Sequence, residues 1–459
     1  MGSLASGAPR RVPLVVGVTG HRDLVDGELN QIRERVRAFF LGLQKQFPDL
    51  PIMVMTPLAE GADRLVAEVA KEFGMRVVIL LPMPQSIYQT DFAGDSLDEF
   101  HSMMALGEVV ELPLVRGNTV ASVAANGRER DLQYAQLGAY LAAHSHILLA
   151  LWDGKDATAA GGTAHVVQFH QHDVMELLAE GQHRSPIDFA EDESDLVYHV
   201  TCSRQEAGPP VAGLHPGDAQ WLTRDDVHPR TDEIPPGYAV VFKRMAEFNR
   251  DIANPPDESE IYPLVPDYNA VSQGIRHIAE LFHRVDALAN QFQRLSHRAM
   301  LASHTLAVLA GLSFIVWADL PEQESMIYPY LIFIAVALLV VDASRRRGWQ
   351  RKSLDYRVLA EGLRVQFYWA LAGVEMENPS RYSHDSVLRQ QDLELGWIRN
   401  VMRYAGHEAD AMLPGDEPGD SEMVVREWVA AQKSYFQSRS HERTLRNRMT
   451  STLMLATFG

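Results

Sequence analysis

Short apolar runs alternate with amphipathic stretches over the first part of the chain. The apolar runs lie at 12–18, 52–55, 76–81, 109–114 and 146–151, and helical stretches separate some of them at 29–47, 62–73 and 131–144. Strands without a polar face need cover on both sides, as in parallel sheets. The pattern predicts an α/β domain over 12–175, with a doubly wound, Rossmann-like parallel sheet that binds ligands at the carboxyl ends of its strands.

The alternation of apolar runs and helical stretches ends at residue 175. Residues 176–266 contain three proline pairs, at 209–210, 235–236 and 255–256, and an acidic cluster at 191–193. Because proline interrupts both helices and sheets, we predict a loop-rich connector with one helix near 239–249. Nothing in this segment indicates chemistry.

Apolar residues then recur at alternating spacings of four and three within residues 268–298. The positions are Val271, Ile275, Ile278, Phe282, Val285, Ala289 and Phe292. Such spacing is typical of a coiled-coil seam. Two interpretations stay open: the helix associates with another copy of the chain, or it packs within its own domain.

Two uncharged segments follow this helix, at 299–318 and 325–341. Twenty helical residues span about 30 Å, the thickness of the bilayer hydrocarbon. Arginines flank both outer ends, whereas the turn at 319–324 carries only acidic charges. The positive-inside rule therefore predicts a transmembrane hairpin with both ends in the cytoplasm. The alternative is a buried helical hairpin in a soluble protein.

Further helices are expected after the hairpin, at 352–374, 397–404 and 423–443. The all-α membrane domain predicted in this way covers residues 267–445. Within residues 446–459, basic residues are followed by an apolar stretch. The sequence at 446–451 resembles that at 298–303, where a basic helix leads into the first span. We interpret this as an internal repeat and as the possible start of a further transmembrane segment.

Composition and charge narrow the functional classes. The chain has 459 residues, a net charge of −18 and one cysteine, Cys202. A single cysteine excludes an internal disulfide and a cysteine-rich zinc site, and it fits a reducing compartment. The acidic balance argues against general nucleic-acid binding, which needs a basic face. Basic residues gather instead at the predicted membrane edge.

Three glycine-containing turns follow strands of the α/β domain. The residues suited to a ligand are Gly17, Thr19, Gly20, His21 and Arg22 in the first turn, Glu60, Gly61 and Asp63 in the second, and Asp153, Gly161, Gly162 and Thr163 in the third. Each turn alone could be a tight strand-to-helix connection. Three at one edge of a sheet favour a ligand crevice.

The residue types in these turns suit a nucleotide. Arg22 can grip a phosphate with two hydrogen bonds, and the amides and hydroxyl around Thr163 can face an anion at a helix start. Glu60 and Asp63 can accept ribose hydroxyls. Neither the P-loop pattern nor G-x-G-x-x-G occurs, which speaks against an ATPase and an ordinary dehydrogenase.

Taken together, the segments 17–22, 58–64 and 161–163 resemble the SLOG superfamily, a Rossmann-like group that includes the lonely-guy phosphoribohydrolases. The resemblance covers residues 12–175 and implies a pocket for a nucleotide-derived ligand. Hydrolytic members carry a glutamate three residues after the turn threonine, where this chain has Val166. Valine can neither position water nor stabilise charge, so the departure favours binding over hydrolysis.

The second half, with its hairpin and the stretch 355–364, resembles the SLATT domain, a two-span membrane effector linked to SLOG sensors in bacterial conflict systems. That resemblance implies a homo-oligomeric pore in the bacterial cytoplasmic membrane, with the N-terminal domain in the cytosol, acting in antiphage defence. Helix packing explains the spacing of Tyr356, Leu359, Leu363 and Phe367.

Two other functions stay open. The chain could be a membrane-anchored nucleotide or nucleoside hydrolase, with Glu60 and Asp63 as its acid and base, or a membrane scaffold with a degenerate α/β domain. A metal site at His165, His170 and His172 is disfavoured, because no carboxylate or cysteine completes the set. We therefore expect a nucleotide-derived ligand and a lipid bilayer as partners, and no metal or organic cofactor.

Overall fold

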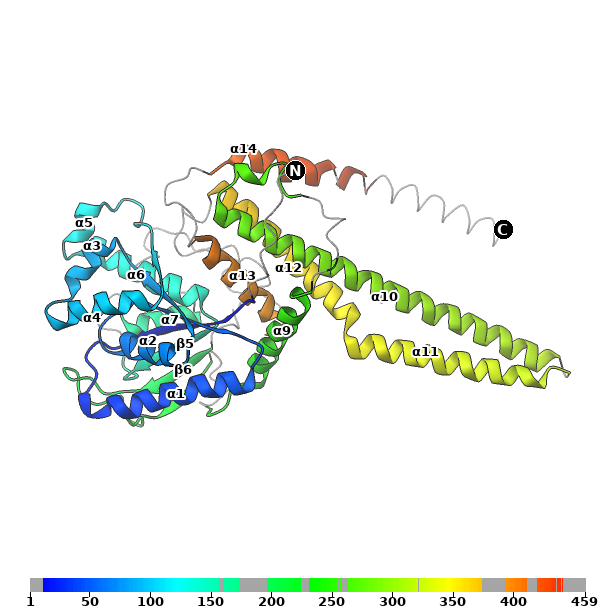
Figure 1. Ribbon diagram of the computed structural model, residues 1–459, viewed down its shortest axis with the longest axis horizontal. Helices are drawn as coiled ribbons and strands as arrows, with labels where there is room; N and C mark the ends of the chain where they lie inside the picture. The colour runs from blue at the N-terminus through cyan, green and yellow to red at the C-terminus, as the bar shows by residue number, and fades with distance from the viewer. Residues whose placement is uncertain are drawn as a thin grey trace.

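A computed structural model describes residues 11–156, 161–172, 196–223, 231–254, 256, 263–320, 322–373, 393–410, 419–434, 436–438 and 440. A globular body carries the sheet, and a long helical hairpin projects from it (Figure 1). The sheet belongs to the first half of the chain and the hairpin to the second. The two halves meet through a layer of helices, and the hairpin lies beyond that layer.

The sheet has seven strands in the order β4-β3-β2-β1-β5-β6-β7. Its strands are β1 Leu14–Gly20, β2 Ile52–Thr56, β3 Arg76–Leu81, β4 Glu108–Glu111, β5 Ile147–Trp152, β6 Val197–Thr201 and β7 Ala219–Leu222. All neighbours run parallel except β6 and β7. The strand order reverses direction at β1, which pairs with β2 on one side and β5 on the other, so the topological switch point lies there.

The predicted α/β sheet is present, and it extends beyond residue 175. The segment predicted as a loop-rich connector supplies β6 and β7. These two strands were not predicted because four or five residues carry little periodicity. The acidic cluster and the proline pairs around them also suggested loops. The fourth apolar run is also shorter than expected: β4 is an edge strand in which only Val110 is buried.

Helices cover both faces of the sheet. They are α1 Leu29–Gln46, α2 Ala62–Glu72, α3 Gln85–Tyr88, α4 Asp95–Met103, α5 Val120–Ala124, α6 Arg128–His144 and α7 Thr163–His172. Helix α1 packs against α2, and α6 packs against α7. Right-handed crossovers place these two pairs on opposite faces, because the strand order runs in opposite directions from β1.

The second half is helical. Its helices are α9 Pro236–Ile252, α10 Gln273–Asp319, α11 Ile327–Arg347, α12 Trp349–Ala372, α13 Gly396–Asp410 and α14 Ser421–Val424, which continues as a π-helix at Val425–Val429. Short 3-10 turns occur at Asp26–Glu28, Gln89–Asp91, Met104–Leu106, Tyr268–Ala270, Glu324–Met326 and Leu393–Leu395. The helix expected near 239–249 is α9.

The predicted coiled-coil seam is buried inside the chain. Helix α10 packs along α12 and also contacts α13. All seven seam residues are buried, from Phe282 and Phe292 at 8% exposed to Val285 at 0%. Of the two interpretations of the seam, the structure therefore supports packing within the same chain. Tyr356, Leu359, Leu363 and Phe367 on α12 are buried as well, in agreement with the predicted helix packing.

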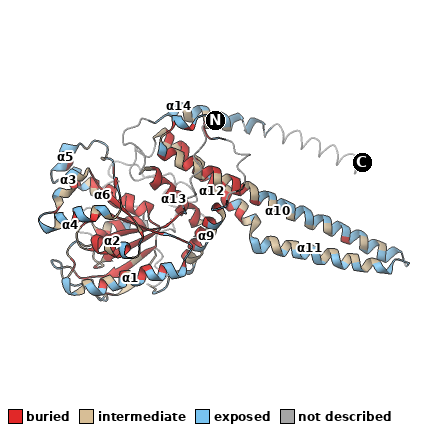
Figure 2. Cartoon of the chain, viewed as in Figure 1, coloured by how far each residue is buried: buried red, intermediate tan, exposed pale blue. Residues whose placement is uncertain are grey.

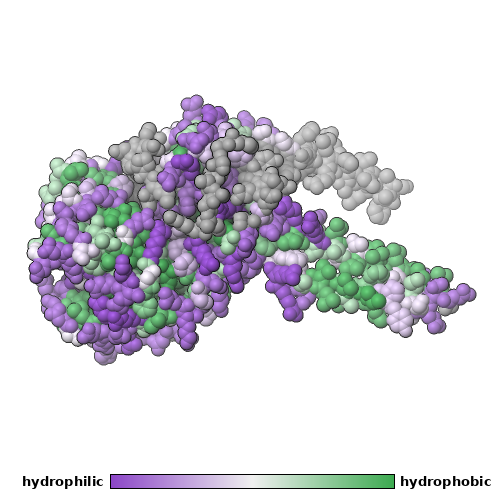
Figure 3. Space-filling view, in the orientation of Figure 1, coloured by the Kyte–Doolittle hydropathy of each residue, from purple (hydrophilic) through white to green (hydrophobic). Residues whose placement is uncertain are grey.

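Helix α10 runs on without a break into the first predicted span, and α11 contains most of the second. Both helices are long and apolar enough to cross a membrane. In the most apolar window of each, 11% and 0% of the residues are buried, unlike a core helix of a soluble protein. The hairpin accordingly shows exposed residues and an apolar surface (Figures 2 and 3). The segment 446–459 lies outside the described residues.

Candidate functional site

A cavity of about 480 Å³ opens at the carboxyl ends of β1 and β5, at the switch point of the sheet. The predicted residues that line it are Thr19, Gly20, His21, Arg22, Asp63, Asp153, Gly161, Gly162 and Thr163. Gly17, Glu60 and Gly61 lie outside this lining. The structure thus brings all three predicted turns to one cavity, and the remaining three positions support the conformation of the chain around it.

The glycines outside the lining, with Gly20, allow close approach of neighbouring chain segments. A Cβ at Gly61, where φ is +74°, would lie 2.3 Å from the carbonyl oxygen of Arg22, and one at Gly20 would lie 2.3 Å from the Cβ of Ala62. The Ala62 amide also donates to the His21 carbonyl at 3.1 Å. The first and second turns are therefore packed backbone to backbone, as only glycine permits. Gly17 plays the same role deeper in β1, against Ser145.

The turn after β2 is held in an unusual conformation. Leu58 has a φ of +55°, a region that residues with a Cβ rarely occupy. The buried Arg64 fixes this turn, since its Nε donates to the Leu58 carbonyl at 3.2 Å and its Nη1 donates to Ser96 and Glu99. Glu60 is bonded by the Ser96 hydroxyl, so its carboxylate is occupied outside the cavity lining.

Asp63 projects from the first turn of α2 into the cavity. Its Oδ2 accepts a hydrogen bond from the Ala59 amide at 3.2 Å. Its Oδ1 is buried and has no hydrogen-bond partner among the residues that the structure describes. Burial raises the pKa of Asp63 to about 7, although the Ala59 amide, Arg22 and Arg64 act in the opposite direction. Asp63 can therefore accept a donor from a ligand or exchange a proton near neutral pH.

Arg22 brings a positive charge to the cavity. Its guanidinium lies 3.8 Å from Asp91, too far for a hydrogen bond, and its side chain is 46% exposed. Asp91 is already engaged by Arg130 at 2.6 Å and by the hydroxyl of Tyr134. Arg22 thus keeps most of its hydrogen-bonding capacity for an anion in the cavity.

His21 and Asp153 form a polar pair at the junction of β1 and β5. The His21 Nε2 lies 3.1 Å from the Asp153 carboxylate and 3.2 Å from the Asp153 backbone nitrogen. A protonated Nε2 donates to the carboxylate, and a deprotonated one accepts from the amide. Burial lowers the pKa of His21, with Asp153 partly opposing that effect, so the neutral ring is favoured. The Oδ2 of Asp153 is buried, and no donor within the described residues bonds it; Lys155 Nζ stands 3.7 Å away.

The third turn leads into α7. Gly161, with a φ of +72°, passes close to Tyr134 on α6, where a Cβ would lie 3.0 Å from the tyrosine Cβ. Gly162, Thr163 and Ala164 line the cavity at the start of the helix. Backbone amides in the first turn of a helix lack intrahelical partners and attract anions. Val166 also lines the cavity, with an apolar side chain.

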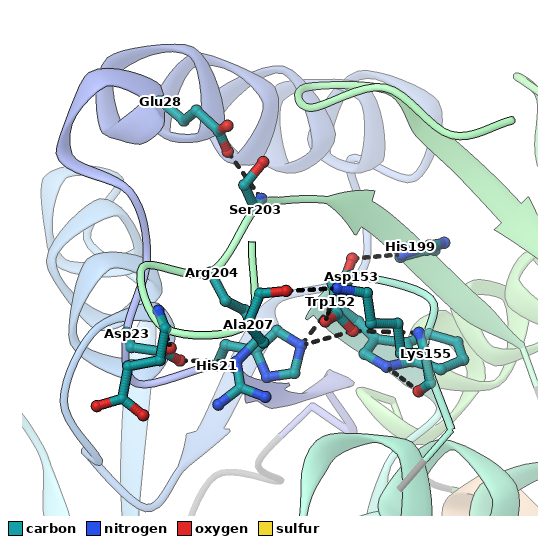
Figure 4. A network of polar contacts seen from close by, with 11 residues as sticks. His21, Asp23, Glu28, Trp152, Asp153, Lys155, His199, Ser203, Arg204 and Ala207 are labelled. Carbon is teal, nitrogen blue, oxygen red and sulfur yellow. Dashed lines mark hydrogen bonds and ion pairs between the residues drawn. The ribbon is translucent and has the colours of Figure 1, made fainter. Parts of the chain in front are cut away.

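Several lining residues were missed by the sequence reasoning. Arg204 and Ala207 follow β6, and Tyr88 and Tyr134 come from α3 and α6. Arg204 donates to Asp23 at 2.9 Å, and Lys155 Nζ donates to the Ala207 carbonyl at 2.8 Å (Figure 4). The apolar run at 196–200, followed by Thr-Cys-Ser-Arg, was the available signal for a further strand that ends in a polar turn.

The histidines of α7 do not form a cluster around a common point. His170 is buried, and its Nδ1 contacts the Ala142 carbonyl at 3.1 Å. Burial lowers the pKa of His170 to about 4. Across the described residues, no group of three or more His, Cys, Asp or Glu side chains is placed to hold a metal ion.

Comparisons of this chain with protein-family models, curated proteins and solved structures find no match. The function therefore rests on the chemistry of the cavity and of the hairpin.

Proposed function

We propose that this chain is a bacterial membrane effector whose cytosolic α/β domain binds a nucleotide-derived signal and thereby gates a membrane assembly of its hairpins. One observation carries the proposal: a single chain joins a cavity whose buried carboxylate oxygens lack a donor among the described residues to a hairpin with exposed apolar side chains. The SLOG and SLATT resemblances support the same division into sensor and effector, and through them a role in antiphage defence.

A nucleotide suits the distribution of charge in the cavity. The start of α7 and the guanidinium of Arg22 offer donors to phosphate oxygens. The Oδ1 of Asp63 and the Oδ2 of Asp153, which no donor bonds in the described part of the chain, are acceptors for hydroxyl or amino groups. A ligand with both an anionic end and several donors, such as a nucleotide with its ribose, would satisfy both sets.

The hairpin suits a bilayer. Its exposed residues include Leu301, Val308, Ile315, Leu331 and Leu339, each more than half exposed. Water contact with so many adjacent apolar side chains is unfavourable, whereas hydrocarbon covers them. Arginines at its base and acidic residues at its tip support a cytoplasmic body under the positive-inside rule. Two helices cannot enclose a pore, so conduction requires several copies.

Helix α6 supplies a physical link between the cavity and the hairpin. Tyr134, Leu137 and Leu141 line the cavity from this helix. On the same helix, between Leu137 and Leu141, the Tyr140 hydroxyl contacts His407 at 3.1 Å and Asp410 at 3.2 Å, both on α13. Helix α13 in turn packs against α10. A ligand that shifts α6 would thus bias the position of α13 and, through α10, of the hairpin, provided that it prefers one arrangement.

The proposal is tested by identifying nucleotides that copurify with the full chain. Mass spectrometry of gently purified wild-type protein should find a bound nucleotide, and the variant Arg22→Ala should lose it, because one charge-assisted bidentate contact is worth about 1.5–3 kcal/mol. Arg116→Ala, an exposed arginine outside the cavity, is the control. Supplying that nucleotide to bacteria that express the chain should collapse their membrane potential. An unchanged potential would contradict gating.

A membrane-anchored hydrolase is the second candidate, and the raised pKa of Asp63 favours it. A carboxyl group with a pKa of about 7 can act as a general acid or base. Val166 and the engagement of Glu60 by Ser96 oppose it. Turnover of nucleotides by the full chain, abolished by Asp63→Asn, would establish this alternative and displace the binding role. A chain that binds no nucleotide would instead be a scaffold.

A further inference from the structure

The base of the hairpin carries four exposed arginines on two helices. Arg298 lies on α10, and Arg345, Arg346 and Arg347 form the last turn of α11. We call these four residues the arginine belt. Arg298 precedes the end of α10 at Asp319 by 21 residues, and Arg347 follows the start of α11 at Ile327 by 20 residues. At 1.5 Å per residue, all four lie at about the same height, roughly 30 Å below the tip.

The chain fixes this height. Helix α11 ends at Gly348, which adopts a left-handed conformation with a φ of +62°, and α12 leaves in a new direction. The Gly348 amide donates to the Arg345 carbonyl at 3.1 Å, which closes the helix end. The belt therefore lies where the chain passes from the apolar hairpin to the body.

Charges next to the belt are paired within the protein. Arg351 contacts Glu247 at 2.6 Å, and Lys352 contacts Asp251 at 2.7 Å, both on α9. These two basic residues belong to the packing between α12 and α9.

Most of the belt arginines have no carboxylate partner among the described residues. In the described part of the chain, neither Arg298 nor Arg345 has a carboxylate partner. Arg346 meets Asp342 at 2.8 Å at the exposed surface, and Arg347 stacks over Trp349 with its guanidinium carbon 5.6 Å from the ring centre. The two basic residues on the body side are thus paired with carboxylates of α9, whereas within the belt only Arg346 meets a carboxylate among the described residues.

We infer that the arginine belt binds the phosphate groups of anionic phospholipids in the leaflet that faces the body. A partner that touches both the belt and the adjoining apolar surface must itself have an anionic group joined to hydrocarbon. The spacing of about 30 Å from the tip matches the hydrocarbon thickness, which puts the belt at headgroup depth. Arginine bonds phosphate in a bidentate manner, and each basic residue near an anionic surface contributes about a fivefold gain in binding. This inference rests on the membrane placement in the proposed function.

The test uses the full chain in neutral detergent mixed with phosphatidylglycerol and phosphatidylcholine in equal amounts. The ratio of the two lipids that copurify is measured by mass spectrometry. Wild-type protein should enrich phosphatidylglycerol, and the variant with Arg→Gln at all four belt positions should lose the enrichment, by about fivefold per arginine. The variant with Arg→Lys at these positions should keep most of it, which separates a charge effect from misfolding.

A matched control removes four positive charges from the body, at Lys45, Lys71, Arg116 and Arg128, and should leave the enrichment unchanged. Equal lipid ratios in wild-type protein and the belt variant, or an equal loss in the control, would overturn the inference. So would displacement of phosphatidylglycerol by millimolar inorganic phosphate, because free phosphate lacks the hydrocarbon that the site requires.

Failure of this inference can be told apart from failure of the proposed function. Alkaline carbonate extraction of membranes reports whether the hairpin is inserted, whatever the lipid. A chain that stays in the membrane without lipid selectivity refutes only the belt. A chain released into the soluble fraction refutes the membrane placement itself.

Discussion

The cavity and the hairpin leave opposite kinds of group without a partner. Around the cavity, the strands are buried and apolar, yet Asp63 Oδ1 and Asp153 Oδ2 find no donor among the described residues. On the hairpin, apolar side chains such as Val308 and Leu339 are 62% and 67% exposed. Unpartnered polar atoms call for a polar ligand, and uncovered apolar atoms call for an apolar solvent.

Helix α10 combines a half that packs against other helices with a half whose apolar side chains are exposed. In its first half, apolar residues occupy one face and pack against α12 and α13. In its second half, apolar residues occur all round the helix and most are exposed. The difference teaches that total hydrophobicity does not separate a packed helix from a membrane helix. The distribution around the axis does, since a stripe can be covered by a neighbouring helix and a full circumference cannot.

The same substitution at two valines of α10 gives the largest expected contrast. Val285 is fully buried in the first half, so Val285→Asp places an unpaired carboxylate in the core. We expect a loss of more than about 4 kcal/mol, enough to unfold the body. Circular dichroism during heating of the purified chain in detergent would show this as an absent or strongly lowered transition. A transition like that of the wild type would mean that the seam is not packed as described.

Val308→Asp, in the exposed half of the same helix, should act on insertion rather than on folding. A carboxylate near the middle of a transmembrane helix costs about 2.5–3.5 kcal/mol of insertion free energy. The body should melt like the wild type, because Val308 does not contribute to its core. Carbonate extraction should release a larger fraction of the variant than of wild-type protein. If both variants unfold the body equally, the distinction between the two halves is wrong.

Asp63→Asn tests the unpartnered oxygen in the cavity through its pH dependence. The folded pKa of Asp63 is about 7, raised by burial from 3.8. A raised pKa means that the folded state prefers the protonated form, so stability is fully present below about pH 4 and falls as the pH rises through 7. Asparagine removes that loss. The variant should therefore exceed wild-type stability at pH 8 by about 1–3 kcal/mol, and by less at pH 5, in denaturant titrations.

Nucleotide binding provides the control for this prediction. A nucleotide that donates to Asp63 should stabilise wild-type protein at pH 8 and should bind the variant less well. A constant difference between variant and wild type from pH 5 to 8 would show that Asp63 does not titrate in the folded state.

Sequence patterns predicted the sheet from several short apolar runs that alternate with helical stretches, and the hairpin from two long uncharged segments. They failed at β6 and β7, where short strands lie among prolines and acidic residues. Within the site, glycine turns correctly pointed to the cavity edge, but the pattern could not tell Asp63 from Glu60. The directions of the two side chains decide that difference. They depend on Ser96, which bonds Glu60 from 36 residues away and Arg64 from 32 residues away. Arg204 was missed because β6, the strand that it follows, was missed.

The smallest expected effect is at Glu60, and it separates the two functional candidates. The Glu60 carboxylate accepts a bond from Ser96 and lies outside the cavity lining, whereas Asp63 lines it. Glutamine keeps an oxygen for Ser96, so Glu60→Gln should change nucleotide binding by less than about twofold, within the range of surface substitutions. Calorimetric titration of the full chain with the copurifying nucleotide measures this directly. A loss of turnover in Glu60→Gln together with intact binding would instead mean that Glu60 moves into the cavity when ligand binds, and the hydrolase would then be the better explanation of the three turns.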